Sequence, residues 1–391
     1  MRMRKATSAL IGLLLAGVAA TPAHAETVRS KQWHLDAMKA DDIWKISTGK
    51  GVTVAVIDTG VARIPELEGQ VLPGKNFASE SYSGDERTDY DNHGTGMAAI
   101  IAGNGKGPGG ADSAFGLAPG AKILPLRVDV GGDGGPLFRS MTQAIRYAAD
   151  SDAKVINISM VGRGKSDELS NAVSYALSKG KLIFAGAGND GGSEVYYPAA
   201  TPGVVGVGAV DPDGAATTES QHNAYVDMSA PGVNIVTGCS GGTGLCNSHG
   251  TSDATALASA SAALLWSAHP DWTNNQVLRV LLNTAGKPVD GVERNDYVGY
   301  GVVRPKIAVP TPGDPGPADV YPLPDLAGAD AAKNPSPSTD GKAPGSAASK
   351  PASQADEKKS GSALPWIALG LGACVLIGGA VTAVLVRRRS H

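Results

Sequence analysis

A run of small residues from 248 to 266, opened by the turn Gly250-Thr-Ser252, constrains the fold of this 391-residue chain most strongly. The run predicts a closely packed helix that begins next to Ser252. The first backbone N–H groups of a helix have no intrahelical partner, and together with the helix dipole they favour an anion. Such a position suits the oxyanion of an acyl-transfer reaction. A simple helix cap is the alternative role for this serine, and the run alone does not distinguish the two.

Short apolar runs alternate with helical patterns along the chain. The segment 52–57 is continuous, apolar and rich in β-branched residues, as is typical of a buried strand. Strands that alternate with helices predict an α/β fold, with a mainly parallel sheet and helices on both faces. We expect further strands at 122–128, 154–159, 181–186 and 204–210, helices at 40–46, 137–150, 167–179 and 271–283, and a glycine-rich loop at 104–114.

Two titratable residues stand at the ends of expected elements. Asp58 follows the strand at 52–57, and in open α/β sheets the carboxyl ends of the strands carry the site. An aspartate that only caps the following turn is the alternative. His93 opens a second small-residue helix at 93–103, which must be buried, so its ring is expected to face a crevice. The acidic segment 79–92 before it indicates a surface loop or a wall of that crevice.

Four sequence blocks resemble the subtilisin-like serine proteases. Val54-Ala-Val-Ile-Asp58-Thr-Gly60, His93-Gly-Thr-Gly96 and Gly250-Thr-Ser252 are similar to the three signature blocks, in the family's order of Asp, His and Ser. Gly186-Ala-Gly-Asn189 is similar to the oxyanion-hole block. The resemblance covers roughly residues 52–268, and it implies a three-layer subtilisin-like fold and the hydrolysis of peptide bonds.

The resemblance also implies a role for each matched residue. Ser252 would be the nucleophile, His93 the general base, and Asp58 the group that orients the imidazole. Asn189 would donate to the oxyanion together with the Ser252 backbone N–H. The substrate backbone would pair as an added strand with Ser159, Met160, Val161 and Gly162. The side chain before the scissile bond would lie against Ala185, Gly186, Ala187 and Gly188.

The chain departs from the family pattern just after the nucleophile. Asp253 stands where the family usually has Met, and Ala256 stands where it usually has Pro. A carboxylate in the first helical turn is favourable to the dipole, and we expect it to point away from Ser252. His34, His222 and His249 are the rival bases, and His249 is near Ser252 only in sequence.

Both ends of the chain carry membrane-related patterns. Residues 1–25 combine a basic start, an apolar middle and a small-residue cleavage site, which predicts a secretory signal peptide. The uncharged stretch at 364–386 is long enough to cross a bilayer, and the arginines at 387–389 should hold the C-terminus in the cytoplasm. We expect these domains: signal peptide 1–25, N-terminal extension 26–50, catalytic domain 51–309, Pro/Ala/Ser-rich stalk 310–362, transmembrane helix 363–386 and cytoplasmic tail 387–391.

Cys239 and Cys246 lie in the part of the chain expected outside the cytoplasm, where disulfides persist. A bridge between them would close a short glycine-rich loop just before Ser252. A metal site is the alternative, but no matched pair of histidines accompanies the cysteines. The third cysteine, Cys374, falls within the predicted span.

The whole layout resembles the mycosins, which are membrane-anchored subtilases associated with type VII secretion in actinobacteria. This resemblance implies protein or peptide substrates, a single-pass cell-membrane location with an extracytoplasmic catalytic domain, and association with the secretion membrane complex. We expect no cofactor, and structural calcium is left open. The net charge of −3 gives no support for nucleic-acid binding.

Two other functions compete with the peptidase function. One is a protease-like scaffold of the membrane complex, and the other is a ligand-binding ectodomain without chemistry. The complete set of catalytic groups argues against the second.

Overall fold

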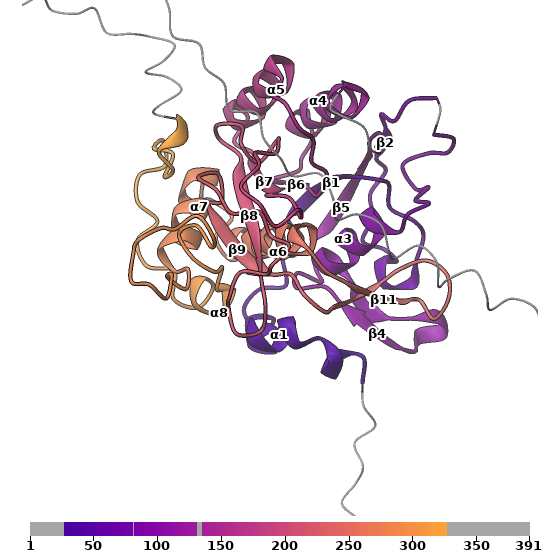
Figure 1. The fold of residues 1–391 in the computed structure, drawn as a ribbon. Coiled ribbons are helices and arrows are strands. Elements are labelled where there is room, and N and C mark those ends of the chain that lie inside the picture. Colours follow the sequence, from indigo (N-terminus) through magenta and orange to yellow (C-terminus); the bar gives the residue numbers. More distant parts are fainter. Residues whose placement is uncertain (1–26, 81, 131–134, 327–391) are drawn as a thin grey trace, which may run out of the picture. The chain divides into compact units, whose positions relative to one another are not determined.

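The computed structural model describes residues 27–80, 82–130 and 135–326. Within these residues a seven-stranded sheet has the order β2-β5-β1-β6-β7-β8-β9, and every neighbouring pair is parallel (Figure 1). The predicted α/β fold with a mainly parallel sheet is therefore confirmed. The strands are β1 (Thr53–Asp58), β2 (Lys75–Asn76), β5 (Lys122–Arg127), β6 (Val155–Ile158), β7 (Leu182–Gly186), β8 (Val205–Val210) and β9 (Met228–Pro231).

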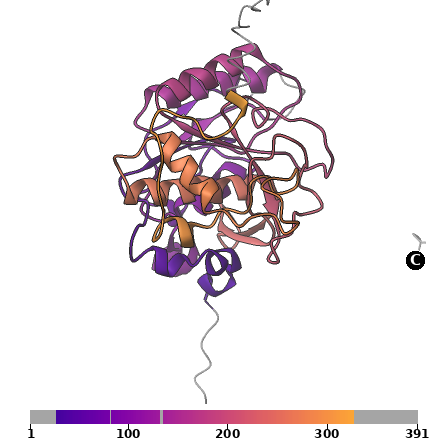
Figure 2. The same ribbon diagram turned by 90° about the vertical axis from the view of Figure 1, so that its left-hand side faces the viewer.

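Helices cover both faces of this sheet. One face carries α4 (Gly135–Asp150) and α5 (Asp167–Ser178), which pack against each other and against β1 and β7 (Figures 1 and 2). The other face carries α3 (His93–Ala102) and α6 (Thr251–Ala268), with α7 (Asn274–Asn283) packed against α6. The short helices are α1 (Trp33–Ala37), α2 (Ala40–Ile43) and α8 (Pro305–Ala308), with 3-10 turns at Arg29–Lys31, Pro65–Leu67 and Pro108–Gly110.

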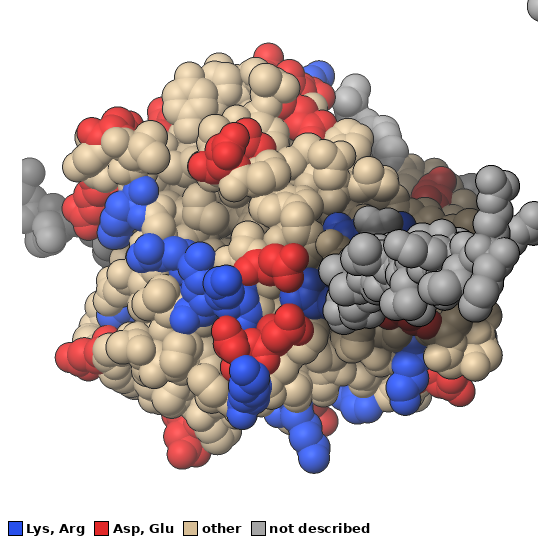
Figure 3. All heavy atoms as spheres, turned by 90° about the horizontal axis from the view of Figure 1, so that it is seen from below, with Lys and Arg blue, Asp and Glu red and all other residues tan. Residues whose placement is uncertain are grey.

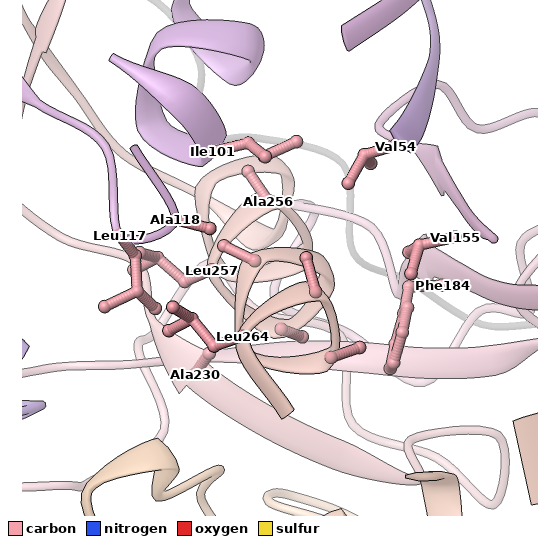
Figure 4. Close-up of a cluster of buried hydrophobic side chains, with 14 of the residues drawn as sticks. Val54, Ile101, Leu117, Ala118, Val155, Phe184, Ala230, Ala256, Leu257 and Leu264 are labelled. Carbon is pink, nitrogen blue, oxygen red and sulfur yellow. The ribbon is translucent and has the colours of Figure 1, made fainter. Parts of the chain in front are cut away.

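The helix α6 runs through the core rather than over it. All its residues from Thr251 to Trp266 are buried. Leu257 and Leu264 lie among side chains from the sheet and from α3, including Val54, Phe184 and Ile101 (Figure 4). The alanines and serines between them have little volume, so α3 and the strands approach the helix backbone closely. This explains the run of small residues at 248–266.

Two antiparallel hairpins pack against α3. The strands β10 (Ile235–Gly238) and β11 (Leu245–Ser248) form one hairpin, and β3 (Asn104–Lys106) and β4 (Asp112–Phe115) form the other. The prediction of a loop throughout 104–114 is therefore wrong. Its glycines suggested irregular structure, but the chain turns at Pro108–Gly110 and pairs its two ends.

The N-terminal extension is bound to the domain by side chains. Gln32 is fully buried, and its amide donates to the carbonyls of Phe115 at 2.7 Å and Val236 at 3.0 Å. The helix expected at 40–46 is shorter in the structure, where α2 spans Ala40–Ile43.

Basic and acidic side chains are intermixed on the surface that is seen from below (Figure 3). Arg29 forms ion pairs with Asp36 and Asp41 within the N-terminal extension.

The segment 310–326, which the sequence assigns to the start of the Pro/Ala/Ser-rich stalk, also packs on the domain. Leu323 is only 3 % exposed, and Arg279 on α7 donates to the carbonyls of Pro315 at 2.7 Å and Pro317 at 2.9 Å. A proline-rich chain makes few hydrogen bonds of its own, so its carbonyls are free to accept from a neighbouring helix.

The remaining predictions for the two ends lie outside the described residues. These are the signal peptide at 1–25, the rest of the stalk at 327–362, the span at 363–386 with Cys374, and the tail at 387–391. Within the part of the chain that the structure describes, no helix has the length and apolar character needed to cross a membrane.

Candidate active site

The candidate site lies at the carboxyl edge of the parallel sheet. Asp58 ends β1, Ser159 follows β6, and Gly186 ends β7. Strand β1 is central, with β5 on one side and β6 on the other, and open α/β sheets bind ligands where the strand order reverses in this way. The helices α3 and α6 start at the same edge and pack against each other, which brings their first residues towards the strand ends.

Asp58 and His93 form a direct pair across this edge. The His93 Nδ1 and Asp58 Oδ1 atoms are 2.7 Å apart, and Asp58 is fully buried. The carboxylate accepts, so Nδ1 carries the hydrogen and Nε2 is left as the acceptor. Gly94 allows this approach, because a Cβ there would lie 2.2 Å from the Gly60 carbonyl oxygen and 2.9 Å from the Asp58 Cβ.

Asp89 supports the pair from the acidic segment before His93. Its Oδ1 accepts from the Thr59 hydroxyl at 2.8 Å, and its Oδ2 accepts from the Thr95 backbone N–H at 2.8 Å. The Thr59 hydroxyl in turn accepts from the Gly94 N–H at 2.9 Å. The sequence indicated a surface loop or a wall of the crevice here, with no role for Asp89. A buried carboxylate within a polar loop has no local signature, because the two threonines that bind it lie elsewhere in the chain.

Ser252 is not a helix cap. The N-cap of α6 is Gly250, and Ser252 is the second residue of the helix. It is 8 % exposed, and its hydroxyl donates to the Ser159 carbonyl at 3.3 Å. In the described structure the hydroxyl has no hydrogen bond with His93, and such contacts are often long or absent before substrate binds.

The Asn189 side chain is oriented by Thr251, the residue before Ser252, for which the sequence predicted no role. Asn189 Oδ1 accepts from the Thr251 backbone N–H at 2.9 Å and from its hydroxyl at 3.0 Å. A backbone N–H can only donate, so the bonded side-chain atom must be the oxygen. The Asn189 Nδ2 donors are therefore left for a ligand next to the start of α6.

The three rival histidines have other partners. His249 Nδ1 lies 2.9 Å from Glu219, and its side chain is 67 % exposed. His34 is buried, which lowers its pKa to about 3. His222 stacks on Tyr297 with ring centroids 4.8 Å apart. His93 is therefore the histidine that the fold brings to the site.

Asp253 is buried beneath the start of α6. Its Oδ2 accepts from the Ser248 hydroxyl at 3.0 Å, which agrees with the expectation that it points away from Ser252. Burial raises the pKa of Asp253 to about 6, against the opposing effects of the Ser248 hydrogen bond and of His93. The carboxylate is therefore charged above this pH and close enough to His93 to act on it electrostatically.

Buried carboxylates control the protonation of His93. The charge of Asp58 raises the pKa of His93 to about 9, against burial, which lowers it. Smaller contributions from Asp253 and Asp89 also raise it. The free imidazole, which alone can accept a proton from a hydroxyl, therefore predominates only at alkaline pH.

The residues expected to bind substrate divide into two groups. The N–H and C=O of Gly162 are both bonded to Tyr197 at 2.9 Å, so they are not free to pair with a peptide. Ala185 is fully buried in the core between the sheet and the helices α4 and α5. The strips 159–161 and 186–188 remain beside the start of α6, where the Gly188 N–H donates to the Thr251 hydroxyl at 3.3 Å.

The predicted bridge between Cys239 and Cys246 is present, with the Cα atoms 5.9 Å apart. It closes the loop between β10 and β11. Within this loop the Ser240 backbone N–H donates to Asn92 Oδ1 at 2.9 Å. The loop therefore holds the residue before His93. In the described part of the chain, no three His, Cys, Asp or Glu residues are grouped as metal ligands.

With this geometry in place, comparison with known proteins defines the class. The model of the subtilase family of peptidases matches residues 49–301, and the chain belongs to this family of serine proteases. A thermophilic serine proteinase of Bacillus sp. (strain AK1) is 36 % identical over 272 residues, which are 69 % of this chain and 64 % of that protein. The chain thus spans less than two thirds of this relative.

Proteins of a narrower group are also similar. Mycosin-1 of Mycobacterium tuberculosis is 34 % identical over 341 residues, which cover 73 % of this chain and 74 % of the relative. The crystal structure of MycP1 from the ESX-1 type VII secretion system superimposes with a TM-score of 0.66 at 29 % identity, covering 76 % of this chain and 90 % of the other. A chain of the periplasmic assembly from the ESX-5 inner membrane complex gives a TM-score of 0.65 at 28 % identity, covering 84 % and 92 %. The predicted resemblance to mycosins is confirmed.

The pKa values give a pH prediction. The second-order rate constant kcat/KM should rise with pH through the pKa of His93, because only the neutral imidazole accepts a proton. Asp253→Asn removes a negative charge that stabilises the imidazolium, so the rising limb should move to lower pH by about 0.5–1 unit. The pH profile of kcat/KM, measured with a chromogenic peptide substrate, tests this shift. Asp91→Asn, at an exposed aspartate two residues before His93, is the control. An identical shift in both variants, or none in Asp253→Asn, contradicts the prediction.

A second prediction concerns Asn189. Asn189→Ala should lower kcat by about 10²–10³ with little change in KM, because the lost donor acts on charge that forms in the transition state. Thr251→Val, which removes one of the two bonds that orient the amide, should cause a smaller loss. Asn171→Ala, at an exposed position on α5, is the control. Steady-state kinetics in which Asn189→Ala matches Asn171→Ala would exclude the oxyanion role.

Proposed function

We propose that this chain is a serine endopeptidase that hydrolyses peptide bonds through an acyl-enzyme. The observation that carries the proposal is the 2.7 Å contact between His93 Nδ1 and Asp58 Oδ1, at the start of a helix packed against the Ser252 helix. Membership of the subtilase family supports it. Asn189, with its oxygen engaged by Thr251, supports it further.

The chemistry follows from the donors and acceptors present. The Ser252 hydroxyl leaves the Ser159 carbonyl and attacks the scissile carbonyl carbon, while His93 Nε2 takes its proton. Asp58 holds the Nδ1–H and stabilises the imidazolium. The oxyanion accepts from the Ser252 N–H and Asn189 Nδ2. His93 then returns the proton to the leaving amine, and a water molecule repeats the sequence to release the acid and restore Ser252.

A peptide substrate would bind as an extended strand. The strip 159–161 follows β6 at the edge of the site, and main-chain pairing with an extended peptide gives affinity without reading sequence. Gly162 takes no part, since Tyr197 occupies both of its main-chain groups. The strip 186–188 then flanks the side chain that precedes the scissile bond.

We also propose that the domain acts outside the cytoplasm, anchored by the apolar stretch at 364–386 and exported by the signal peptide at 1–25. Its partner would be a type VII secretion membrane complex. The similarity to Mycosin-1 and to a chain of the ESX-5 periplasmic assembly supports this placement. That assembly match also favours a second candidate function, in which the domain stabilises the complex whether or not it cleaves peptides.

The peptidase proposal predicts covalent labelling. The full chain, purified in detergent, should react with a fluorophosphonate probe at Ser252, because the probe traps an activated serine hydroxyl. Ser252→Ala should abolish the label, and Ser178→Ala, on the surface helix α5, should retain it. Folded protein that shows no labelling, or labelling that survives Ser252→Ala, rules out the proposed nucleophile. Mass spectrometry of the labelled peptide identifies the site.

If the domain acts as a scaffold, cells with a catalytically inactive protein should differ from cells that lack the protein. Cells that carry Ser252→Ala should retain the assembled membrane complex, whereas cells that lack the protein should lose it. Native electrophoresis of detergent-solubilised membranes and the amount of secreted substrate measure both effects. Equal losses in the two strains would leave catalysis as the only role.

A further inference from the structure

Asn92, the residue before His93, is a helix N-cap whose side chain does not cap its helix. An asparagine at the N-cap commonly accepts a hydrogen bond from the first N–H groups of the helix. In α3 the Asn92 side chain makes no such bond, although its carbonyl oxygen accepts from the Gly96 N–H at 2.9 Å. The side chain is therefore available for a contact elsewhere in the fold.

That contact is made with Ser240, which lies 148 positions further along the chain. The Asn92 Oδ1 atom accepts from the Ser240 backbone N–H at 2.9 Å and also from the Ser240 hydroxyl. Because a backbone N–H can only donate, the bonded atom of the amide must be its oxygen. Two donors on one oxygen fix the direction of the Asn92 side chain.

The backbone of Asn92 has a left-handed conformation, with φ +61° and ψ +4°. Asparagine adopts this conformation more readily than most residues, but it still needs surrounding structure to hold it there. A rotation of this backbone would displace the next residue, His93, whose Nδ1 atom lies 2.7 Å from Asp58 Oδ1. The contact with Ser240 therefore bears directly on the position of the imidazole.

Ser240 is itself held by the bridge between Cys239 and Cys246. Three of the five residues at 240–244 are glycines, which have large conformational freedom, so this loop would not hold Ser240 by itself. The bridge closes the loop, and the Cys239 N–H donates to the Gly244 carbonyl at 3.0 Å. The position of Ser240 thus depends on the bridge.

Strand β10 joins the start of this loop to α3 at a second place. The Thr237 hydroxyl donates to the carbonyl of Gly96, in the first turn of α3, at 3.1 Å. Thr237 also pairs with Cys246 across the hairpin. Of the two connections between the bridged hairpin and the start of α3, the one through Asn92 is adjacent to His93.

We propose that Asn92 is a positioning residue of the peptidase, through which the bridge between Cys239 and Cys246 holds the His93 imidazole against Asp58. This inference rests on the proposed function. Asn92 takes no part in the chemical steps, because its side chain bonds to Ser240 and acts only through the histidine that follows it. Loss of the amide and loss of the bridge should therefore loosen the same contact.

The test measures peptide cleavage by the full chain, purified in detergent, as a function of pH. Asn92→Gly allows the left-handed backbone and removes the side-chain contact, so kcat should fall by about tenfold or more with little change in KM. The rising limb of kcat/KM should move to lower pH, because a longer contact with Asp58 raises the pKa of His93 less. Asp253 and Asp89 also raise this pKa and remain in place, so the shift reports the contact with Asp58.

The double variant Cys239→Ser/Cys246→Ser removes the bridge and should lower kcat and move the limb in the same direction. Combined with Asn92→Gly, it should cause less than about twofold further loss, because both changes act through one contact. Losses that multiply in the combined variant would show independent effects and would overturn the inference.

Asn92→Asp is the conservative variant, because a carboxylate oxygen can accept both bonds from Ser240 and aspartate also tolerates the left-handed conformation. At high pH its kcat should stay within about threefold of the unaltered protein, and its limb should move to higher pH, since a carboxylate near His93 favours the imidazolium. Asn234→Gly, at an exposed asparagine with a φ of +51°, is the matched control and should change neither quantity. Equal changes in Asn234→Gly and Asn92→Gly overturn the inference.

Two further measurements separate this inference from the proposed function. The proton NMR signal of the His93 Nδ1–H, which the short bond to Asp58 shifts downfield, should weaken in Asn92→Gly and in the cysteine variant. Unaltered protein that reacts with a fluorophosphonate, with this signal and kcat unchanged in both variants, overturns the positioning role and leaves the peptidase proposal intact. Folded unaltered protein that is neither labelled nor active overturns both. If Asn92→Gly does not fold, the cysteine variant decides the question alone.

Discussion

The close approach of α6 to the sheet and to α3 is the constraint on which the rest of the structure depends. The helix is buried from Thr251 to Trp266, and its small side chains leave room for strands on one side and for α3 on the other. Large residues there would overpack the interface. Both helices begin at the carboxyl edge of the sheet, so their packing brings His93 and Ser252 to the same edge as Asp58.

The same close packing places three carboxylates near the His93 imidazole. Asp58 and Asp253 are fully buried and Asp89 is nearly so, and all three raise the pKa of His93. Hydrogen bonds lower the cost of a buried charge, and each carboxylate accepts from a nearby hydroxyl or N–H group, although Asp58 Oδ2 and Asp253 Oδ1 have no hydrogen-bond partner in the described structure. The arrangement favours the imidazolium that forms during acyl transfer. Its consequence is that the neutral base becomes abundant only at alkaline pH.

Much of the fold and the main candidate residues could be predicted from the sequence. Apolar β-branched runs located the main strands, and the end of the first run led to Asp58, whereas the resemblance to the subtilases led to Asn189. The hairpin at 104–115 and the packing of 310–326 could not be predicted, because glycine-rich and proline-rich segments are held by distant partners such as Arg279. Asp89 was missed for the same reason, since its loop looks like solvent-exposed chain.

The sequence by itself determined the five strands β1, β5, β6, β7 and β8, the two small-residue helices and the chemical groups at their ends, because burial and periodicity are properties of neighbouring residues. The tertiary structure alone decided whether Ser252 caps its helix, which way the Asn189 amide points and which residue binds the Asn92 side chain. Each depends on contacts between residues far apart in the chain, as between Asn189 and Thr251, which are 62 positions apart. Local sequence does not encode such contacts, since they form only when the whole sheet is assembled.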